Sequence, residues 1–201
     1  MSANTKTYYA AVSEFTKAFA QRRFRFVSDV PTKVLELRIS LIEEEEAELQ
    51  KGIREDSKVE ILDGLCDLVY VVVGTMIVCG ISAEPFSATT KHDYNQIWKS
   101  IDALVSELRL GIPCHKRSTR YSNDLLQALD RAGYPNLPKA FQVVHQNNMG
   151  KLWSHKPEDK TLLVTHYQDK FLVKNSQGKV IKPPGYTRPD LTPFIDLPTT
   201  K

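Results

Sequence analysis

Apolar residues recur every three or four positions along most of the chain, which is the period of an amphipathic α-helix. The pattern predicts a first helix over about residues 6–22, followed by a linker over residues 24–31. A second helix then begins at Thr32, which follows Pro31 and is placed to cap the helix. Its apolar stripe consists of Leu35, Ile39, Ile42, Leu49 and Ile53.

A third helix follows the polar turn at residues 54–57 and is apolar on nearly every side. Ser57 and Glu60 have the spacing of a capping box at its start, and the helix runs to about Cys79 and stops at Gly80. A helix that is apolar all round lies in the centre of a fold. This helix also needs more covering surface than one small subunit offers, which favours assembly with a second subunit.

The second half of the chain predicts three more helices. A fourth helix spans residues 93–110, and a basic loop over residues 114–120 follows it. A short fifth helix covers about residues 125–132 and is closed by Gly133. A sixth helix follows Pro138, with Ala140, Val143 and Val144 on its apolar face.

The period changes near Lys160, where alternating residues predict two short strands at residues 161–167 and 170–174. Prolines then become frequent, so the end of the chain is expected to be extended, lying over the body or loose. The fold class is therefore all-α: a four-helix-bundle-like core with extra helices and a small C-terminal β-hairpin. Residues 1–201 are expected to form a single domain, in which residues 160–201 are the hairpin and the extended tail.

Composition limits the possible partners. The chain has 201 residues, of which 41% are hydrophobic, so it can bury a full core. Its formal net charge of +3 is small, which argues against a polymeric nucleic acid or a membrane as a partner. The longest apolar run, Leu68–Val73, is far shorter than the roughly 20 residues that span a bilayer.

The cysteines and the first residues indicate a compartment. Cys66, Cys79 and Cys114 are odd in number and have no CxxC spacing, so they are interpreted as small core residues in a reducing environment. Residues 1–10 lack the apolar segment of a secretory signal. The expected location is the cytoplasm.

The placement of charge is more informative than its sum. Acidic residues cluster between Glu36 and Asp67, whereas basic residues accumulate from Lys91 onward. An acidic site that faces basic residues suits a complex of a divalent cation with a polyphosphate. The stretch Lys116–Arg120 either contacts phosphates or is solvated.

Residues 43–46 are four consecutive glutamates, and such a run is typical of a solvated helix face. At 100° per residue, however, Glu45 and Glu48 fall in the same sector as part of the apolar face, while Glu44 points to the opposite side. Glu46 also falls near the apolar stripe. The pattern alone therefore does not choose among the glutamates.

The third helix carries a polar stripe at spacings of three and four residues, formed by Glu60, Asp63, Asp67, Tyr70 and Gly74. Buried carboxylates stay ionised only if cations lie near them. The helix from Glu60 to Gly80 contains no basic residue, so a divalent metal is one solution and pairing with lysines or arginines from elsewhere is the other. Oxygen ligands without His or Cys favour Mg²⁺ or Mn²⁺ over zinc.

These acidic segments resemble a known family. Residues 41–49 and 60–75 are similar to the EExxE and ExxD signature of the all-α NTP pyrophosphatases, which include MazG, the phosphoribosyl-ATP pyrophosphohydrolases and the dimeric dUTPases. Residues 144–151 resemble the VHxxNMxK segment of a MazG-like subgroup found in phages and bacteria. Residues 178–191 resemble its GKVxKxxxY…PDL ending. Residues 85–139 match none of these motifs and look like a subgroup insertion.

The resemblance implies a metal-dependent hydrolase that cleaves a nucleoside triphosphate to the monophosphate and pyrophosphate. The implied ligands of Mg²⁺ or Mn²⁺ are Glu44, Glu45, Glu48, Glu60, Asp63 and Asp67. Of these, the residues expected to carry catalysis are Glu45, Glu48, Glu60 and Asp63. The residues expected to bind the substrate are Asn148, Lys151, Lys182 and Tyr186. Members of this superfamily assemble as oligomers, so a homodimer or homotetramer is expected.

Two other functions remain open at this stage. The chain is alternatively a non-catalytic helical interaction module with structural acidic residues. A di-iron oxidoreductase is the closest architectural rival, but the five histidines lack the ExxH spacing of such sites. For the triphosphate hydrolase, analogy with phage nucleotide-pool enzymes favours dGTP or GTP as the substrate.

Overall fold

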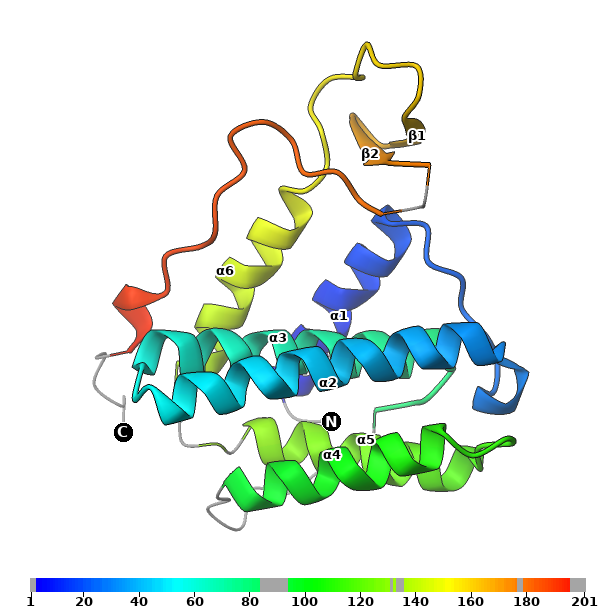
Figure 1. The fold of residues 1–201 in the computed structure, drawn as a ribbon, viewed down its shortest axis with the longest axis vertical. Helices are drawn as coiled ribbons and strands as arrows, with labels where there is room; N and C mark the ends of the chain where they lie inside the picture. The colour runs from blue at the N-terminus through cyan, green and yellow to red at the C-terminus, as the bar shows by residue number, and fades with distance from the viewer. Residues whose placement is uncertain (1–2, 84–93, 131, 133–135, 177–178, 196–201) are drawn as a thin grey trace.

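A computed structural model describes residues 3–83, 94–130, 132, 136–176 and 179–195. The described residues form six α-helices, two 3₁₀ turns and one two-stranded sheet (Figure 1). In chain order the elements are α1 (Ala3–Ala18), η1 (Val27–Asp29), α2 (Thr32–Arg54), α3 (Lys58–Val78), α4 (Tyr94–Leu108), α5 (His115–Asp130), α6 (Leu137–Met149), β1 (Leu163–Tyr167), β2 (Lys170–Lys174) and η2 (Thr192–Phe194). The predicted all-α class with a small hairpin is confirmed.

Helices α2 and α3 form a long antiparallel hairpin across the middle of the molecule (Figure 1). Two glycines let their backbones approach closely. A Cβ atom on Gly64 would lie 3.0 Å from the Cα atom of Leu49, and one on Gly52 would lie 3.0 Å from the backbone nitrogen of Ile61. This close packing fixes the height of each residue of α2 relative to α3, and with it the height of the acidic residues on both helices.

Helix α3 is central, as its composition predicts, and it contacts α1, α2, α5 and α6. It is long and apolar enough to cross a membrane, yet 89% of its most apolar 18-residue window is buried by the rest of the chain. Its apolar surface is therefore covered within one chain. The expectation that this helix requires a second subunit to cover it was wrong, because the segments flanking the α2–α3 hairpin supply the cover.

The two ends of α3 follow the sequence signals. The Ser57 hydroxyl accepts a hydrogen bond from the backbone nitrogen of Glu60 at 3.4 Å, as the N-cap of a capping box does. Gly80 ends the helix with a φ of 68°, and a Cβ atom there would lie 2.3 Å from the carbonyl oxygen of Arg25. Glycine is required at this position by both its backbone conformation and its surroundings.

The start of α2 and the end of α1 differ from their predictions. Pro31 is the N-cap of α2 and Thr32 is already helical, so Thr32 makes no capping hydrogen bond. Helix α1 ends at Ala18 rather than near residue 22, because Ala20 adopts a left-handed φ of 51°. The backbone nitrogen of Gln21 then donates to the carbonyl oxygen of Thr16 at 2.9 Å, which closes the helix end.

The stretch 114–120 was predicted to be a loop, but residues 115–120 form the first turns of α5. The buried face of α5 begins with Ser118 and Ser122, which are fully buried, and becomes apolar only at Leu125. Over its first two turns, the helix therefore has no apolar residues at helical spacing from which it could be predicted. Arg117 is exposed and its Nε atom lies 2.6 Å from Glu107, which explains part of the basic stretch as an ion pair with α4.

The described part of the segment 85–139 consists mainly of α4, α5 and the start of α6. Helices α4 and α5 pack against each other and lie on one side of the α2–α3 hairpin, whereas α1 and α6 lie on the other (Figure 1). Residue Asp93 and the predicted helix end at Gly133 lie outside the described residues. The side of the hairpin that faces α1 and α6 is the side that carries the polar stripe of α3.

The hairpin forms as predicted, with Val164 opposite Val173 and a left-handed φ of 53° at Gln168 in its turn. The chain then continues along β2, where the backbone nitrogen of Ile181 donates to the carbonyl oxygen of Val173 at 2.9 Å. The indole nitrogen of Trp153 donates to the carbonyl oxygen of Ile181 at 2.8 Å. These bonds fix where the chain leaves the hairpin.

Residues 179–195, called the strap below, then run from the hairpin along α6 (Figure 1). The side-chain amide of Asn147 donates to the carbonyl oxygen of Thr187 at 2.7 Å, and that of Asn136 donates to the carbonyl oxygen of Phe194 at 3.0 Å. Leu191 is buried in the main core. The strap thus lies over the body of the molecule, which was one of the two expectations for the proline-rich tail.

Candidate functional site

A cleft of about 460 Å³ lies between the α2–α3 hairpin and the segments that cover it. Such a volume is within the range of small-molecule sites. Its walls come from the end of α1, from α2, α3 and α6, and from the strap. The polar residues that line it are Gln21, Arg38, Glu44, Glu45, Glu48, Asp63, Asp67, Tyr70, Asn147, Asn148, Lys151, Lys182, Tyr186 and Arg188.

Five of the six predicted metal ligands line this cleft. They are called the acid cluster below and consist of Glu44, Glu45, Glu48, Asp63 and Asp67. Helix α2 supplies the three glutamates and α3 supplies the two aspartates one turn apart. None of the five forms an ion pair with a basic residue among those the structure describes. Ion pairing with core lysines or arginines therefore does not explain this cluster within the described part of the chain.

The ionised form of the acid cluster is energetically unfavourable. Burial, together with the negative charges of Asp67 and Glu48, raises the pKa of Glu45 to about 8. Burial and the charge of Asp63 raise the pKa of Asp67 to about 7, although Lys151 acts in the opposite direction. The pKa of Asp63 is raised by burial and by Glu60. The cluster is a concentration of negative charge that Lys151 and Arg188 compensate only in part.

Glu60, the sixth predicted ligand, is exposed and lines a smaller adjoining cleft together with Glu48 and Arg188. Its charge still acts on Asp63. Among residues 3–83, 94–130, 132, 136–176 and 179–195, no three His, Cys, Asp or Glu side chains converge closely enough to hold a metal ion as they stand. The structure brings five of the predicted ligands to one cleft and places the sixth beside it.

Three basic residues face the acid cluster. Lys151 and Lys182, both predicted to bind substrate, line the same cleft, and Arg188 joins them from the strap. The Nζ atom of Lys151 donates to the Oδ1 atom of Asn148 at 2.5 Å, while that of Lys182 lies 5.0 Å from the centre of the Tyr186 ring. Burial lowers the pKa of Lys151.

Sequence reasoning missed Arg188. Arg188 lies between Tyr186 and Pro189 in the C-terminal motif, so its place in that motif could have indicated a role in the site. Its charge acts on Asp63 and on Asp67, whose pKa values it lowers. Only the path of the strap brings it there, and that path depends on contacts distant in sequence.

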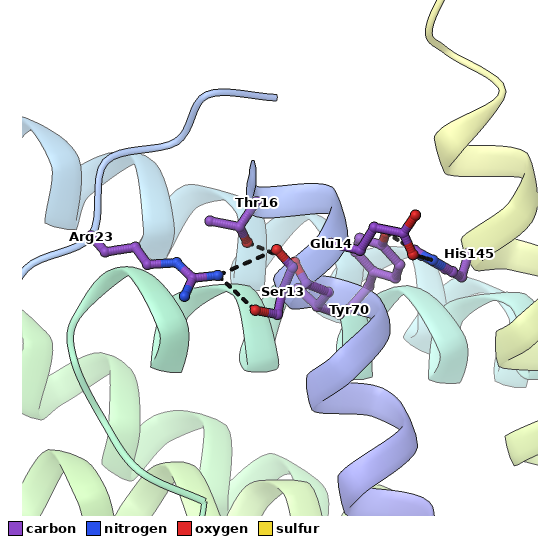
Figure 2. Close-up of polar contacts among 7 residues, drawn as sticks. Ser13, Glu14, Thr16, Arg23, Tyr70 and His145 are labelled. Atoms are coloured by element: carbon purple, nitrogen blue, oxygen red, sulfur yellow. Dashed lines mark hydrogen bonds and ion pairs between the residues drawn. The ribbon is translucent and has the colours of Figure 1, made fainter. Parts of the chain in front are cut away.

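A chain of polar contacts connects Tyr70 of α3, which lines the cleft, with His145 of α6 and Glu14 of α1 (Figure 2). The hydroxyl of Tyr70 lies 3.0 Å from the Nδ1 atom of His145, whose Nε2 atom lies 3.3 Å from Glu14. A His145 ring protonated on Nε2 satisfies both of its contacts, because it accepts from Tyr70 and donates to Glu14. This chain fixes Tyr70, which lines the cleft beside Asn148. The Oδ1 atom of Asn148 in turn orients Lys151.

Tyr186 lines the cleft as predicted, but its hydroxyl is already engaged. It donates to the Oδ1 atom of Asn147, the residue whose amide nitrogen also holds Thr187. Asn147 therefore ties the strap to α6 at two successive points. The Tyr186 ring, with Lys182 over it, forms part of the cover of the cleft.

Another part of the cleft, beside α1, has a different character. It is lined by Val12 and Phe15 of α1, by Gln21, and by Arg38 and Gly74 of the hairpin. Arg23 fixes the turn that carries Gln21, because its Nη2 atom donates to the hydroxyl of Ser13 at 2.7 Å (Figure 2). Arg38 was not among the predicted site residues. A charged residue beside the apolar stripe of the second helix was the available signal.

The fold is all-helical apart from the small hairpin, and its two central antiparallel helices both present carboxylates to one cleft. The model of the phosphoribosyl-ATP pyrophosphohydrolase family matches residues 12–93, which include α2 and α3. The resemblance found in the sequence is confirmed over this region. The match supports a pyrophosphohydrolase-like function related to nucleotides.

A second comparison extends over nearly the whole chain. The uncharacterized protein L479 of Acanthamoeba polyphaga mimivirus is 24% identical to it over 242 aligned positions, which cover 94% of this chain and 96% of the relative. No solved structure gives a significant match. The similarity to L479 indicates a shared architecture that includes the segments beyond residues 12–93.

Proposed function

We propose that this protein is a metal-dependent nucleoside triphosphate pyrophosphohydrolase, which converts a (d)NTP and water to the (d)NMP and pyrophosphate. One observation carries the proposal: the acid cluster and the three cations Lys151, Lys182 and Arg188 line the same cleft. A triphosphate with a bound divalent cation presents both negative and positive charge. Such a ligand complements a site that holds both signs of charge on opposite walls.

The residues of the acid cluster fit Mg²⁺ or Mn²⁺. All donors are carboxylate oxygens, which these hard cations prefer. The raised pKa values of Glu45 and Asp67 reflect negative charge that a cation would neutralise. Glu45, Glu48 and Asp63 are proposed to hold the ion, with Glu44 and Asp67 beside them and Glu60 acting from the adjoining cleft. The bound cation would supply charge neutralisation of the triphosphate and an activated water.

The basic side of the cleft is proposed to hold the phosphates. Lys151 is oriented by its hydrogen bond to Asn148, and Lys182 and Arg188 approach from the strap. Water adds to the α-phosphorus, the bond from this phosphorus to the bridging oxygen breaks, and pyrophosphate leaves. A carboxylate of the acid cluster takes up the proton of the water. The three cations stabilise the negative charge of the departing pyrophosphate.

The proposal is tested by incubating the purified chain with each of the eight common NTPs and dNTPs, with Mg²⁺ or Mn²⁺, and resolving the products by ion-exchange chromatography. The expected products are monophosphate and pyrophosphate in equal amounts, and excess EDTA should prevent their formation. Release of orthophosphate and a diphosphate would contradict cleavage at the α-phosphorus. If no nucleotide is cleaved and no cation binds, a non-catalytic interaction module becomes the better explanation.

The setting of this activity is part of the same proposal. The chain is proposed to control a nucleotide pool in the cytoplasm, with dGTP or GTP as the substrate and a homodimer or homotetramer as the assembly. Light scattering during size-exclusion chromatography measures the assembly directly. A monomer at micromolar concentration would contradict that part of the proposal and leave the chemistry unaffected.

A further inference from the structure

Arg38 is a buried cation that has no acidic partner among the residues that the structure describes. Only 6% of its surface is exposed, and it lines the cleft together with Val12, Phe15 and Gly74. No carboxylate of the described residues forms an ion pair with it. Burial lowers its pKa to about 10, so it remains charged at neutral pH. Burying a charge without a partner is unfavourable, and the position therefore calls for a ligand that accepts hydrogen bonds.

The hydrogen bonds that Arg38 makes to described residues leave one end of its guanidinium group available. Its Nε atom donates to the hydroxyl of Thr75 at 3.0 Å and its Nη2 atom donates to the carbonyl oxygen of Val71 at 2.8 Å. Both bonds use the side of the planar group that faces α3. The remaining N–H groups belong to Nη1 and Nη2 and form a second fork. Such a fork matches a ligand with two adjacent acceptor atoms.

Gly74 makes room for this arrangement. A Cβ atom at this position would lie 2.8 Å from the Nη2 atom of Arg38. Gly74 lies in the interior of α3, where glycine is less favourable than alanine. Any side chain here would displace the guanidinium group from its place in the cleft. The lack of a side chain at Gly74 thus leaves space for the guanidinium group of Arg38.

The position of Arg38 along α2 assigns it to the nucleoside end of a bound nucleotide. Arg38 and Glu45 are seven residues apart on one helix, which corresponds to about 10 Å at 1.5 Å per residue. Lys151 and Arg188 act on the charge of Asp67, and Lys151 also interacts with Glu45, so these two cations lie at the acid cluster. If phosphates bind there, the base reaches the end lined by Phe15, Gln21 and Arg38. Phe15 and Val12 supply apolar surface for the faces of a base.

We infer that this end of the cleft is a nucleobase subsite in which Arg38 selects a base edge with two adjacent hydrogen-bond acceptors. This inference rests on the proposed function. The O6 and N7 atoms of guanine form such an edge, and the O2 and N3 atoms of cytosine form another. Adenine is rejected because its N6 amino group would point a donor at the guanidinium donors. Thymine and uracil are rejected because an N–H donor separates their two carbonyl oxygens.

The inference is tested by measuring kcat/KM for dGTP, dCTP, dATP and dTTP with the wild-type chain and with Arg38→Lys and Arg38→Met. The wild-type chain should prefer dGTP or dCTP over dATP and dTTP by about tenfold or more. The preferred nucleotide identifies which acceptor edge is bound. Both variants should lose most of this preference, because lysine keeps the charge without the fork. Arg54→Met, at the exposed end of the same helix, is the control and should retain the preference.

A purely structural role for Arg38 makes a different prediction. Loss of its two bonds to α3 would lower Tm and reduce kcat/KM by the same factor for every nucleotide, and this result would overturn the inference. Gly74→Ala offers an independent check, since it keeps the arginine but displaces its guanidinium group. It should reduce the base preference as the Arg38 variants do. An unchanged preference in Gly74→Ala would mean that the placement of the guanidinium group does not set the preference. A loss in Arg38→Met but not in Arg38→Lys would mean that Arg38 acts through charge alone. Either result contradicts the inference.

A binding measurement separates this inference from the proposed reaction. Calorimetric titration of dGMP, dCMP, dAMP and dTMP into the wild-type chain and Arg38→Met requires no catalysis. Selective, Arg38-dependent binding without hydrolysis of any triphosphate would contradict the proposed reaction and support the nucleobase subsite. Hydrolysis without base preference would support the reaction and contradict the subsite. Absence of both hydrolysis and selective binding would reject both.

Discussion

The two sides of the cleft are built in different ways. The acid cluster lies on α2 and α3, two long helices held in close contact at Gly52 and Gly64. The facing side consists of the end of α6 and the strap, an irregular segment held by individual hydrogen bonds such as those of Asn147. The helical side fixes its charges by backbone packing. The strap side fixes its charges by a few side chains.

This difference suggests a division of labour. Carboxylates that repel one another stay together only on a rigid support, because a flexible segment would move them apart. Cations that bind the phosphates of an incoming substrate gain from a segment that is able to move aside and return. We therefore expect changes on the helical side to affect the chemical step. Changes on the strap side should affect substrate binding.

The largest effect is expected from removing charge on the helical side. Glu48→Gln and Asp63→Asn each remove a charge while keeping the volume of the side chain. A metal site contributes several kcal/mol to the stabilisation of the transition state, so kcat should fall on the order of a thousandfold or become undetectable. Pyrophosphate release measures the loss, and circular dichroism should give an unchanged helical content.

Glu43→Gln is the matched control for these variants. Glu43 belongs to the same glutamate run but lies close to Arg109 in an exposed ion pair, 2.5 Å between Oε1 and Nη2. Exposed ion pairs contribute little to stability. This variant should retain activity within about twofold. A loss in Glu43→Gln equal to that in Glu48→Gln would mean that the activity follows total charge and not the acid cluster.

The pH dependence of stability should reveal the repulsion within the acid cluster. The folded chain raises the pKa of Glu45 from 4.5 to about 8 and that of Asp67 from 3.8 to about 7. Between these limits the folded state binds more protons than the unfolded state, so the free energy of unfolding falls as pH rises from about 4 to 8. The expected decrease is on the order of 3 kcal/mol in the presence of EDTA. Urea denaturation at pH 5.0, 6.5 and 8.5 measures it.

Two further measurements assign this pH effect to the cluster. Glu45→Gln should flatten the dependence and make the metal-free chain more stable at pH 8.5, even though it abolishes activity. Mn²⁺ should raise Tm more at pH 8.5 than at pH 5.0, because protons compete with the cation for the carboxylates. A metal-free chain that becomes more stable between pH 5.0 and 8.5 would show that the carboxylates are compensated.

The helical side of the cleft could be predicted from sequence because both of its determinants are local. Helical periodicity places Asp63 and Asp67 on one face of α3, and the apolar residues around them place that face inside the molecule. The same reasoning left the choice among the glutamates open and placed Glu44 on the side opposite Glu45, which was wrong because both line the cleft. Packing of α2 on α3 resolves them, with Glu44 and Glu45 lining the cleft and Glu46 bonded to Gln50.

The strap side could be predicted only through the resemblance. Lys151, Lys182 and Tyr186 were identified from motifs and do line the cleft, but Arg188 enters it through the path of the strap, which no local pattern encodes. The basic stretch at the start of α5 was misinterpreted as a loop for a related reason. Its buried face begins with Ser118 and Ser122, and buried serines carry no apolar period.

A smaller effect is expected from loosening the strap. Asn147→Ala removes the acceptor of the Tyr186 hydroxyl and the donor to the carbonyl oxygen of Thr187. KM should rise about tenfold with kcat changed less, and the free energy of unfolding should fall by about 1–3 kcal/mol. Gln142→Ala on the same helix is the control and should leave both values unchanged. A fall in kcat without a rise in KM would place the strap in the chemical step and remove the proposed division of labour.

The smallest effect is expected at the start of α3, where Ser57→Ala removes the N-cap hydroxyl. The bond it accepts from Glu60 is long, at 3.4 Å, so the free energy of unfolding should fall by only about 0.5 kcal/mol. Ser40→Ala is the matched control: Ser40 is exposed within α2, and alanine there should be neutral or slightly stabilising because it favours the helix. Measuring kcat of Ser57→Ala tests the contrast between the helical side and the strap side of the cleft. If the α2–α3 packing holds Asp63 in place, Ser57→Ala should keep full kcat despite the weaker helix end; a clear loss of kcat would mean that the acid cluster depends on local caps as much as the cations depend on the strap.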